Sequence, residues 1–278
     1  MFSIDSKEEV SPEKRVSIKL IASDLDGTIL RDGAQQCSSR LYELIQALYE
    51  KGVLFVPASG RQYPNMHRLF GHLDEQILYL CENGALVMRQ NEPVFQWNFK
   101  RELALAISNA IIDRPECEII ICCPKASYTI PKTAEFVSYM RDEIGYTLEI
   151  IERPEQITES ILKVSYYTDP ALRSKIGAEI YPRFAGQCLM VESGNEWVDF
   201  APFGVSKGNA LACIGEALGI APEEMAAFGD NENDRTMLEY VGHPYRMDTS
   251  SPIIKDIPAK ICRRVEDELQ EILDSFFE

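Results

Sequence analysis

The chain has 278 residues, of which 45% are hydrophobic and 26% charged, the proportions of an ordinary globular protein. Its formal net charge of −16 at pH 7 argues against a nucleic-acid partner, because nonspecific binding to nucleic acid needs a basic surface. No apolar run reaches the roughly 18 residues that a membrane helix needs. We therefore expect a protein with neither a nucleic-acid nor a membrane partner.

The N-terminal segment and the cysteines indicate the compartment. Residues 1–15 are polar and lack the hydrophobic core of a signal peptide, so we interpret them as an N-terminal extension. The eight cysteines form no C-x-x-C pair, which makes a zinc site improbable. We expect reduced thiols in a cytoplasmic protein.

Strands and helices alternate in the first part of the chain. The apolar run over 18–23 predicts a buried strand, and helical spacing over 39–49 predicts a helix that ends at Gly52. Strands are predicted over 53–58 and 77–81, with a helix over 63–70 between them. Strand–helix–strand units with short connections predict a parallel sheet.

A different pattern follows. Residues 94–97 are predicted to form a hairpin with residues 86–88. Further strands are predicted over 118–122, 148–150, 162–167 and 189–191, and helices over 100–112, 135–143 and 171–180. This segment is interpreted as an α+β module inserted into the first domain.

The first pattern returns near the end of the chain. We predict strands over 197–200 and 225–228. Helices are predicted over 206–218 and 265–277, and a further helix after the second strand runs through residues 237–240. The predicted fold class is α/β, with a Rossmann-like parallel-sheet core and an inserted α+β cap domain. The predicted domains are a core of residues 16–86 and 196–278, a cap of residues 87–195 and the extension of residues 1–15.

The segment Asp24–Thr28, sequence DLDGT, directly follows the first strand. Open α/β sheets bind ligands at the edge where their parallel strands end. Two carboxylates one residue apart at that edge suit a hard divalent cation and leave an oxygen free as a nucleophile or proton carrier. The structural alternative is an Asx turn, which also uses Asp and Gly.

Two further polar elements stand at the end of a strand or the start of a helix. Ser59, Gly60 and Arg61 follow the second strand and offer a hydroxyl and backbone amides to a phosphate oxygen, although an ordinary turn has the same composition. Lys207 lies in the first turn of a predicted helix, where the helix dipole disfavours a cation. This placement hints at a function, against the alternative of a solvated surface lysine.

The fourth element is the loop Gly229–Asp234, sequence GDNEND, behind the strand over 225–228. It carries acids and amides at the end of a buried strand. A calcium loop is the alternative, but the EF-hand spacing is absent.

Together and in this order, the four elements resemble the four motifs of the haloacid dehalogenase-like superfamily, whose members are mostly phosphatases. Asp24–Thr28 matches the first motif, Ser59 the second, Lys207 the third and Gly229–Asp234 the fourth. The long insert, with Glu82–Ala85 at its entrance, resembles the Cof-type phosphatase subgroup with an α/β cap. One departure is Phe203-Gly204-Val205, where the family often has a Pro-Lys-Gly run, but the lysine itself is retained.

The resemblance implies a Mg²⁺-dependent phosphatase that hydrolyses small phosphomonoesters, such as sugar phosphates, through an aspartyl-phosphate. Asp24 is then the nucleophile, and Asp26 is the general acid and base, which needs a raised pKa in a partly buried site. The implied metal ligands are Asp24, the backbone carbonyl of Asp26, and Asp230. The implied phosphate contacts are Leu25, Ser59, Gly60, Lys207 and Asn233. Asp234 is expected to lie behind these ligands and to orient either Lys207 or a metal-bound water.

Two alternatives stay open. A phosphomutase or phosphotransferase of the same superfamily has both aspartates, and a catalytically silent protein that binds a phosphorylated metabolite is a non-enzymatic alternative. The dehalogenases of the superfamily lack an acid two residues after the nucleophile, so Asp26 argues against that reaction. Four basic residues of the insert are interpreted as surface groups rather than further phosphate contacts: Arg89, Arg141, Lys163 and Arg183.

Overall fold

The structure is a computed structural model that describes residues 17–193 and 196–277. The predicted extension over residues 1–15 lies outside the described residues. Within the described part of the chain, no helix is long and apolar enough to cross a membrane.

The larger of the two sheets outside the inserted module has five parallel strands in the order β14-β13-β12-β1-β2. The strands are β1 (Leu20–Ser23), β2 (Leu54–Pro57), β12 (Met225–Gly229), β13 (His243–Met247) and β14 (Lys260–Cys262). The chain leaves β1 towards β2 on one side, and β12 lies on the other side, so the strand order reverses at β1. Ligands bind at such a switch point in open α/β sheets. The predicted α/β class with a parallel sheet is confirmed.

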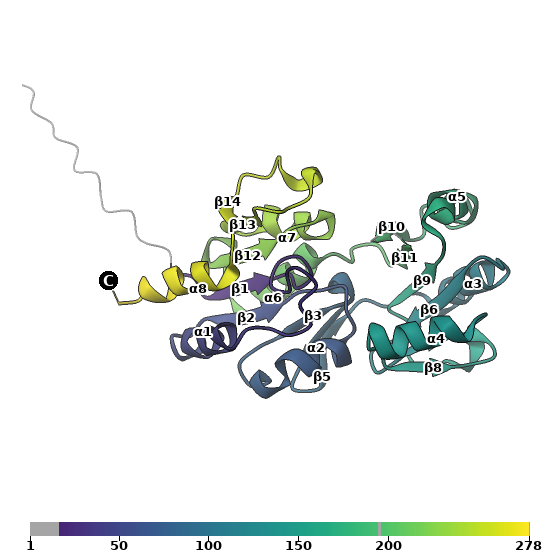
Figure 1. Ribbon diagram of the computed structural model, residues 1–278, viewed down its shortest axis with the longest axis horizontal. Helices are drawn as coiled ribbons and strands as arrows, with labels where there is room; N and C mark the ends of the chain where they lie inside the picture. Colours follow the sequence, from purple (N-terminus) through teal and green to yellow (C-terminus); the bar gives the residue numbers. More distant parts are fainter. Residues whose placement is uncertain (1–16, 194–195, 278) are drawn as a thin grey trace, which may run out of the picture.

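Helices cover both faces of this sheet (Figure 1). Ile21 of β1 packs on the side of α1 and α8, whereas Leu20 and Ala22 pack on the side of α6 and α7. This alternation arises because successive side chains of a strand point to opposite faces. The helices of this part are α1 (Ser39–Glu50), α2 (Tyr63–Phe70), α6 (Lys207–Leu218), α7 (Arg235–Tyr240) and α8 (Val265–Asp274).

A small antiparallel sheet adjoins β2. It has the order β3-β4-β5, with β3 (Tyr79–Cys81), β4 (Leu86–Arg89) and β5 (Glu92–Gln96). Parallel bridges from Phe55 to Ile77 and from Ala58 to Leu80 attach it to the β2 side. The predicted hairpin is confirmed, but it pairs with β3 rather than with the strands of the inserted module.

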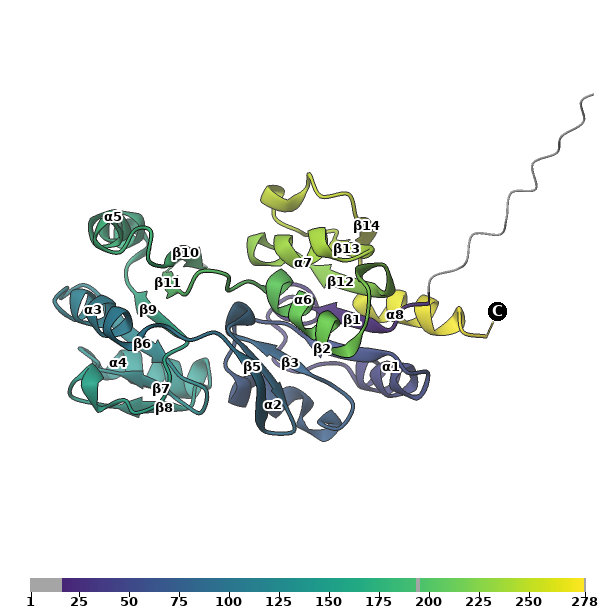
Figure 2. The same cartoon turned by 180° about the vertical axis from the view of Figure 1, so that it is seen from behind.

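The inserted module is built on a six-stranded sheet of order β10-β11-β9-β6-β7-β8. Its strands are β6 (Glu118–Cys122), β7 (Ser127–Thr129), β8 (Leu148–Ile150), β9 (Lys163–Tyr167), β10 (Leu189–Ser193) and β11 (Trp197–Ala201). Its helices are α3 (Arg101–Ile112), α4 (Ala134–Ser138) and α5 (Pro170–Ile180), and a π-helical turn over Tyr139–Glu143 continues α4. Figures 1 and 2 show this module beside the five-stranded sheet.

The prediction that 197–200 resumes the parallel core is wrong. These residues form β11, which pairs antiparallel with β9 and β10 in the six-stranded sheet. Their largely apolar sequence is typical of a core strand and misled the prediction. The sequence pattern also missed β7, β13 and β14.

The six-stranded sheet presents two different faces. Val164, Tyr166, Val198 and Phe200 belong to the apolar cluster that α3 and α5 cover. The alternate residues of the same strands face a cavity and include Lys163, Ser165, Trp197 and Asp199. The period of two along each strand therefore decides which side chains line the cavity.

Candidate active site

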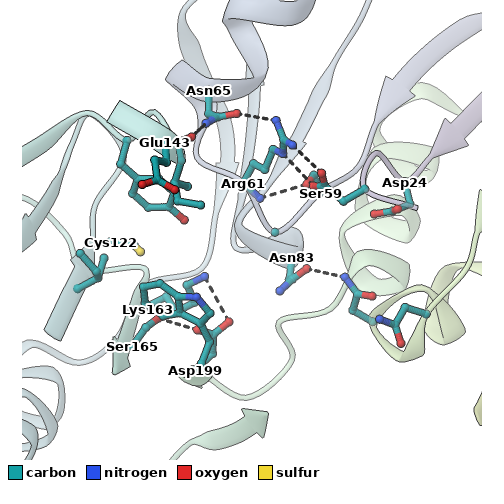
Figure 3. A pocket seen from close by; sticks show the side chains of 18 of the residues that line it. Asp24, Ser59, Arg61, Asn65, Asn83, Cys122, Glu143, Lys163, Ser165 and Asp199 are labelled. Carbon is teal, nitrogen blue, oxygen red and sulfur yellow. Dashed lines mark hydrogen bonds and ion pairs between the residues drawn. The ribbon is translucent and has the colours of Figure 1, made fainter. Parts of the chain in front are cut away.

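The strand ends bring three predicted motifs to one edge. Asp24 follows β1, Ser59 follows β2 and Asp230 follows β12. Because β1 pairs in parallel with both β2 and β12, these residues leave the sheet on the same side. All three line one cavity of about 490 Å³ that also reaches the inserted module (Figure 3).

Lys207 is the centre of the charge network. It is the first residue of α6, and Ser206 caps this helix by accepting a hydrogen bond from the Asn209 backbone N–H. The Lys207 side chain is 0% exposed, and its Nζ lies 2.6 Å from Asp24 Oδ1 and 2.6 Å from Asp234 Oδ1. The alternative of a solvated surface lysine is therefore wrong.

Asp234 holds Lys207 and the motif loop together. Its Oδ1 accepts the Lys207 hydrogen bond, and its Oδ2 accepts from the backbone N–H groups of Asp230 at 2.9 Å and Asn231 at 3.0 Å. Both oxygens of this buried carboxylate are thus engaged. Asp234 therefore contacts Lys207, one of the two groups that it was expected to orient.

Glycine is required at position 27. Gly27 has φ +92°, and a Cβ there would lie 2.4 Å from Asp230 Oδ2. The next residue, Thr28, donates a hydrogen bond to Asp230 Oδ1 at 3.0 Å. The first motif thus orients the acid of the fourth motif.

The turn Glu82–Gly84 connects β3 to β4 and packs against the start of α6. Glu82 and Asn83 both have left-handed backbone angles, with φ of 52° and 56°. A Cβ on Gly84 would lie 2.3 Å from the carbonyl oxygen of Ser206, so this turn packs directly on the residue before Lys207. Such strained backbone persists where the surrounding structure imposes it and is frequent at functional sites.

The clustered carboxylates of the site outnumber the nearby positive charges. Burial, followed by the Asp234 carboxylate, raises the pKa of Asp24 well above its usual value, and the same two causes raise the pKa of Asp230. Burial lowers the pKa of Lys207, but Asp234 and Asp24 outweigh it and raise the net pKa. Three carboxylates surround one ammonium group, which favours binding of a further cation.

The residues present fit a divalent metal ion. Among the described residues, Asp24, Asp230 and Asp234 each place one carboxylate oxygen within 4.8 Å of the others. Both oxygens of Asp234 already accept hydrogen bonds, so Asp24 and Asp230 are the carboxylates available to a metal ion. Asp24 Oδ2 is buried without a hydrogen-bond partner. An all-oxygen, anionic set with an unpartnered buried oxygen suits Mg²⁺. The Asp26 side chain is engaged elsewhere, which leaves its backbone carbonyl as the expected ligand.

The Asp26 side chain pairs with Arg61. Arg61 Nε donates to Asp26 Oδ2 at 2.8 Å, and Arg61 Nη2 donates to Oδ1 at 2.5 Å. The Asp26 side chain is 57% exposed, so the expectation of a partly buried acid is wrong. Arg61 also donates to Asn65, whose amide donates to the Ile144 carbonyl of the inserted module at 2.7 Å. Sequence reasoning included the Arg61 backbone in the predicted phosphate-binding element but gave its side chain no role.

The predicted phosphate contacts differ in position. Ser59 is buried, and its Oγ accepts a hydrogen bond from the Arg61 backbone N–H at 3.2 Å. Gly60 and Asn233 line the cavity, and Asn233 donates to Asn83 Oδ1 at 3.1 Å. The Leu25 side chain is instead 0% exposed in the apolar core, so only its backbone is available to a phosphate.

A second charge cluster was missed by the sequence interpretation. Lys163 Nζ lies 2.8 Å from Glu82 Oε2 and 3.3 Å from Asp199 Oδ2, and the Lys163 side chain is only 8% exposed. Asp199 also accepts a hydrogen bond from Ser165 at 2.6 Å. The interpretation of Lys163 as a surface group is wrong for this position. The alternating pattern of the strand was the signal, since Lys163 shares a face with Ser165.

Comparison with known proteins agrees with this fold and site. The family described as haloacid dehalogenase-like hydrolase matches residues 21–268. The chain therefore belongs to the haloacid dehalogenase-like hydrolases. Its relatives are phosphatases, and the chain is accordingly a phosphoric monoester hydrolase of the Cof type.

Individual relatives support the same assignment. The chain is 27% identical over 239 residues to a 5-amino-6-(5-phospho-D-ribitylamino)uracil phosphatase of Escherichia coli (strain K12), covering 86% of this chain and 88% of the relative. It is 22% identical to an HMP-PP phosphatase of Klebsiella pneumoniae (strain 342), covering 85% and 86%. A haloacid dehalogenase-like hydrolase structure from Bacteroides thetaiotaomicron has a TM-score of 0.83 at 21% identity, covering 92% of this chain and 100% of the other. This last likeness concerns the fold, and the predicted core with an inserted cap is confirmed.

Proposed function

We propose that this phosphatase hydrolyses small phosphomonoesters, such as sugar phosphates, in a Mg²⁺-dependent reaction through an aspartyl-phosphate on Asp24. The observation that carries the proposal is the buried Lys207 ammonium group, 2.6 Å from both Asp24 and Asp234 at the edge where Asp230 also lies. This arrangement supports the proposal, because the Asp24 carboxylate lies beside positive charge that can bind a phosphoryl group.

In the first step, an oxygen of Asp24 attacks the phosphorus atom and forms a new O–P bond while the bond to the alcohol oxygen breaks. Asp26 gives its proton to the leaving oxygen. Lys207, Ser59 and the Asn233 amide stabilise the charge of the transferring oxygens. When bound, Mg²⁺ would be held by Asp24, Asp230 and the Asp26 carbonyl and would offset the repulsion between carboxylate and phosphate.

In the second step, Asp26 removes a proton from water, whose oxygen attacks the phosphorus atom. The bond to Asp24 breaks, inorganic phosphate leaves and the carboxylate is restored. Arg61 holds the Asp26 carboxylate by two hydrogen bonds, which favours the ionised form that acts as the base in the second step. To carry the proton of the first step, Asp26 has to release one of these two hydrogen bonds.

The test is release of inorganic phosphate from p-nitrophenyl phosphate and from a panel of phosphorylated metabolites. The Escherichia coli relative is named for a substrate whose ribityl leaving group is a polyol, so polyol phosphates belong in the panel. Stoichiometric phosphate release indicates hydrolysis, whereas transfer of the phosphoryl group to a second position of the same sugar indicates the mutase alternative.

We expect activity to require Mg²⁺ and to be inhibited by excess Ca²⁺, whose larger and more flexible coordination disfavours the required geometry. Mg²⁺ at about 100 times its Kd should also stabilise the fold by about 2.7 kcal/mol and raise the Tm by on the order of 5 °C. The measurements are phosphate release and a thermal shift with Mg²⁺ or EDTA. Asp230→Asn should abolish the shift, and activity that survives exhaustive chelation contradicts the metal assignment.

We expect Asp26→Asn to lower kcat/KM for alkyl phosphates by about 10²–10⁴-fold, because an alkyl oxygen is a poor leaving group unless it receives a proton as the bond to phosphorus breaks. The loss should be much smaller for p-nitrophenyl phosphate, whose phenolate leaves unprotonated. Steady-state kinetics on both substrates measures the difference. Equal losses on the two substrates would show that Asp26 does not protonate the leaving group.

The cap is proposed to be the unit of the six-stranded sheet and to provide the wall that faces the leaving group. The pairing of β11 with β9 moves its proposed end from residue 195 to residue 201, and the pairing of β4 and β5 with β3 moves its start beyond residue 96.

We also propose a cytoplasmic location, which the eight free cysteines support because such thiols persist in reducing compartments.

A further inference from the structure

The two ends of the cavity are lined by different parts of the fold. Asp24, Ser59 and Asp230 line the end at the sheet edge, where the proposed function places the phosphoryl group. The opposite wall comes from the cap strands β6, β9 and β11 (Figure 3). Whatever alcohol the phosphoryl group leaves behind must fit against this opposite wall.

The cation on this wall is already neutralised. Lys163 is flanked by two carboxylates, Glu82 at 2.8 Å and Asp199 at 3.3 Å. One ammonium group cannot balance two carboxylates, so the cluster carries an excess negative charge. Asp199 also accepts from Ser165, which fixes this carboxylate at the cavity surface.

The second cation near the wall is also paired. Both Arg61 nitrogen atoms that reach Asp26 form a bidentate pair with it, and Arg61 Nη1 donates to Asn65 Oδ1 at 3.0 Å. Bidentate pairs of this kind are geometrically specific and strong. The guanidinium group is thus committed to Asp26 and Asn65.

The charges on this wall and directly behind it sum to a negative value. Glu143 lines the cavity and is exposed. Arg61 and Asp26 balance each other at the core side, so on the wall one cation, Lys163, stands against three carboxylates: Glu82, Glu143 and Asp199. A carboxylate or second phosphate on the leaving group would meet like charge here, whereas hydroxyl groups can donate to the carboxylate oxygens and exchange hydrogen bonds with Ser165.

We propose that the leaving-group end of this cavity selects uncharged, hydroxyl-bearing alcohols and rejects substrates that carry a second anionic group. Tyr146 and Trp197, which also line the cavity, provide apolar surface for the carbon skeleton or a ring. This inference rests on the proposed phosphatase function and narrows its substrate class to monophosphates of neutral polyols or similar compounds.

The test compares two open-chain substrates that differ at one end, D-glucitol 6-phosphate and 6-phosphogluconate. We expect kcat/KM of the full-length protein to be about tenfold or more higher for glucitol 6-phosphate, an effect in the range of one unbalanced like charge. If neither compound is hydrolysed, their Ki values against p-nitrophenyl phosphate turnover give the same ratio.

Two variants change the wall charge. Asp199→Asn removes one carboxylate and leaves Lys163 in a balanced pair with Glu82, so the preference should fall by about tenfold. Glu143→Gln alters an exposed residue that the fold does not depend on and should reduce the preference by about twofold to threefold. Glu149→Gln is the matched control, because Glu149 is an exposed cap acid outside the cavity lining and should leave the ratio unchanged.

The outcomes separate the two proposals. A preference for 6-phosphogluconate in the unaltered protein, or a ratio that neither variant changes, overturns the inference while phosphatase activity stands. If Asp199→Asn does not fold, as judged by circular dichroism, Glu143→Gln against Glu149→Gln decides the question. Release of no phosphate from any substrate contradicts the proposed function itself.

Discussion

Replacing Asp24 with asparagine should lower kcat/KM by on the order of 10⁴-fold or more, because an amide oxygen cannot form the phosphoenzyme. The side chain keeps its shape, and Lys207 keeps its hydrogen bond to Asp234. Steady-state kinetics with p-nitrophenyl phosphate measures the loss. A rate within tenfold of that of the unaltered protein contradicts covalent catalysis by Asp24.

The same variant should keep or raise the stability of the fold. Burial raises the pKa of Asp24 in the folded state above its value in the unfolded chain. Protonated Asp24 therefore stabilises the fold at low pH, and this contribution is lost as the pH rises through the folded-state pKa. Asparagine does not ionise, and the Tm in EDTA at neutral pH should equal or exceed that of the unaltered protein. Asp142→Asn, an exposed site outside the cavity lining, is the matched control and should change neither activity nor Tm.

Replacing Lys207 with methionine should remove activity and also destabilise the fold. Loss of one preorganised charge at the transferring phosphoryl group costs about 10²–10³-fold in kcat. Because the Lys207 side chain is 0% exposed, its removal leaves Asp24 and Asp234 buried without their partner, a change that costs about 3–5 kcal/mol. Denaturant unfolding and phosphate release measure the two losses separately.

Two further variants test that account. Lys175→Met removes an exposed lysine of α5 and should leave both quantities close to those of the unaltered protein. Lys207→Arg keeps the charge, but its planar guanidinium group does not reproduce the compact ammonium between the two carboxylates. It should restore part of the stability and little of the activity, and a full recovery of activity would show that positive charge alone is sufficient.

The local pattern of the sequence predicted the elements that carry the motifs. Apolar runs before Asp24 and Asp230 were sufficient to predict β1 and β12, because strands buried on both faces have nearly continuous hydrophobic sequences. The position of Lys207 in the first turn of α6 was likewise predicted from helical spacing. Parallel pairing then required these strand ends to share one edge.

Pairing between distant strands was not predictable from such patterns. β11 has the burial of a parallel core strand but pairs antiparallel with β9 and β10, and a strand's own sequence does not specify its neighbours. The short strands β13 and β14 consist mostly of half-buried or exposed residues, so they carry a weak hydrophobic signal.

The sequence by itself determined the catalytic motifs, their order and the family resemblance, because each motif depends on residues close together in the chain. Only the tertiary structure decided that Arg61 pairs with Asp26 and that Lys163 meets Glu82 and Asp199 inside the cavity. These charges come from separate elements, and the pairing of a charge depends on distances of a few ångströms between such elements. The charge character of the leaving-group wall is therefore a property of the folded molecule.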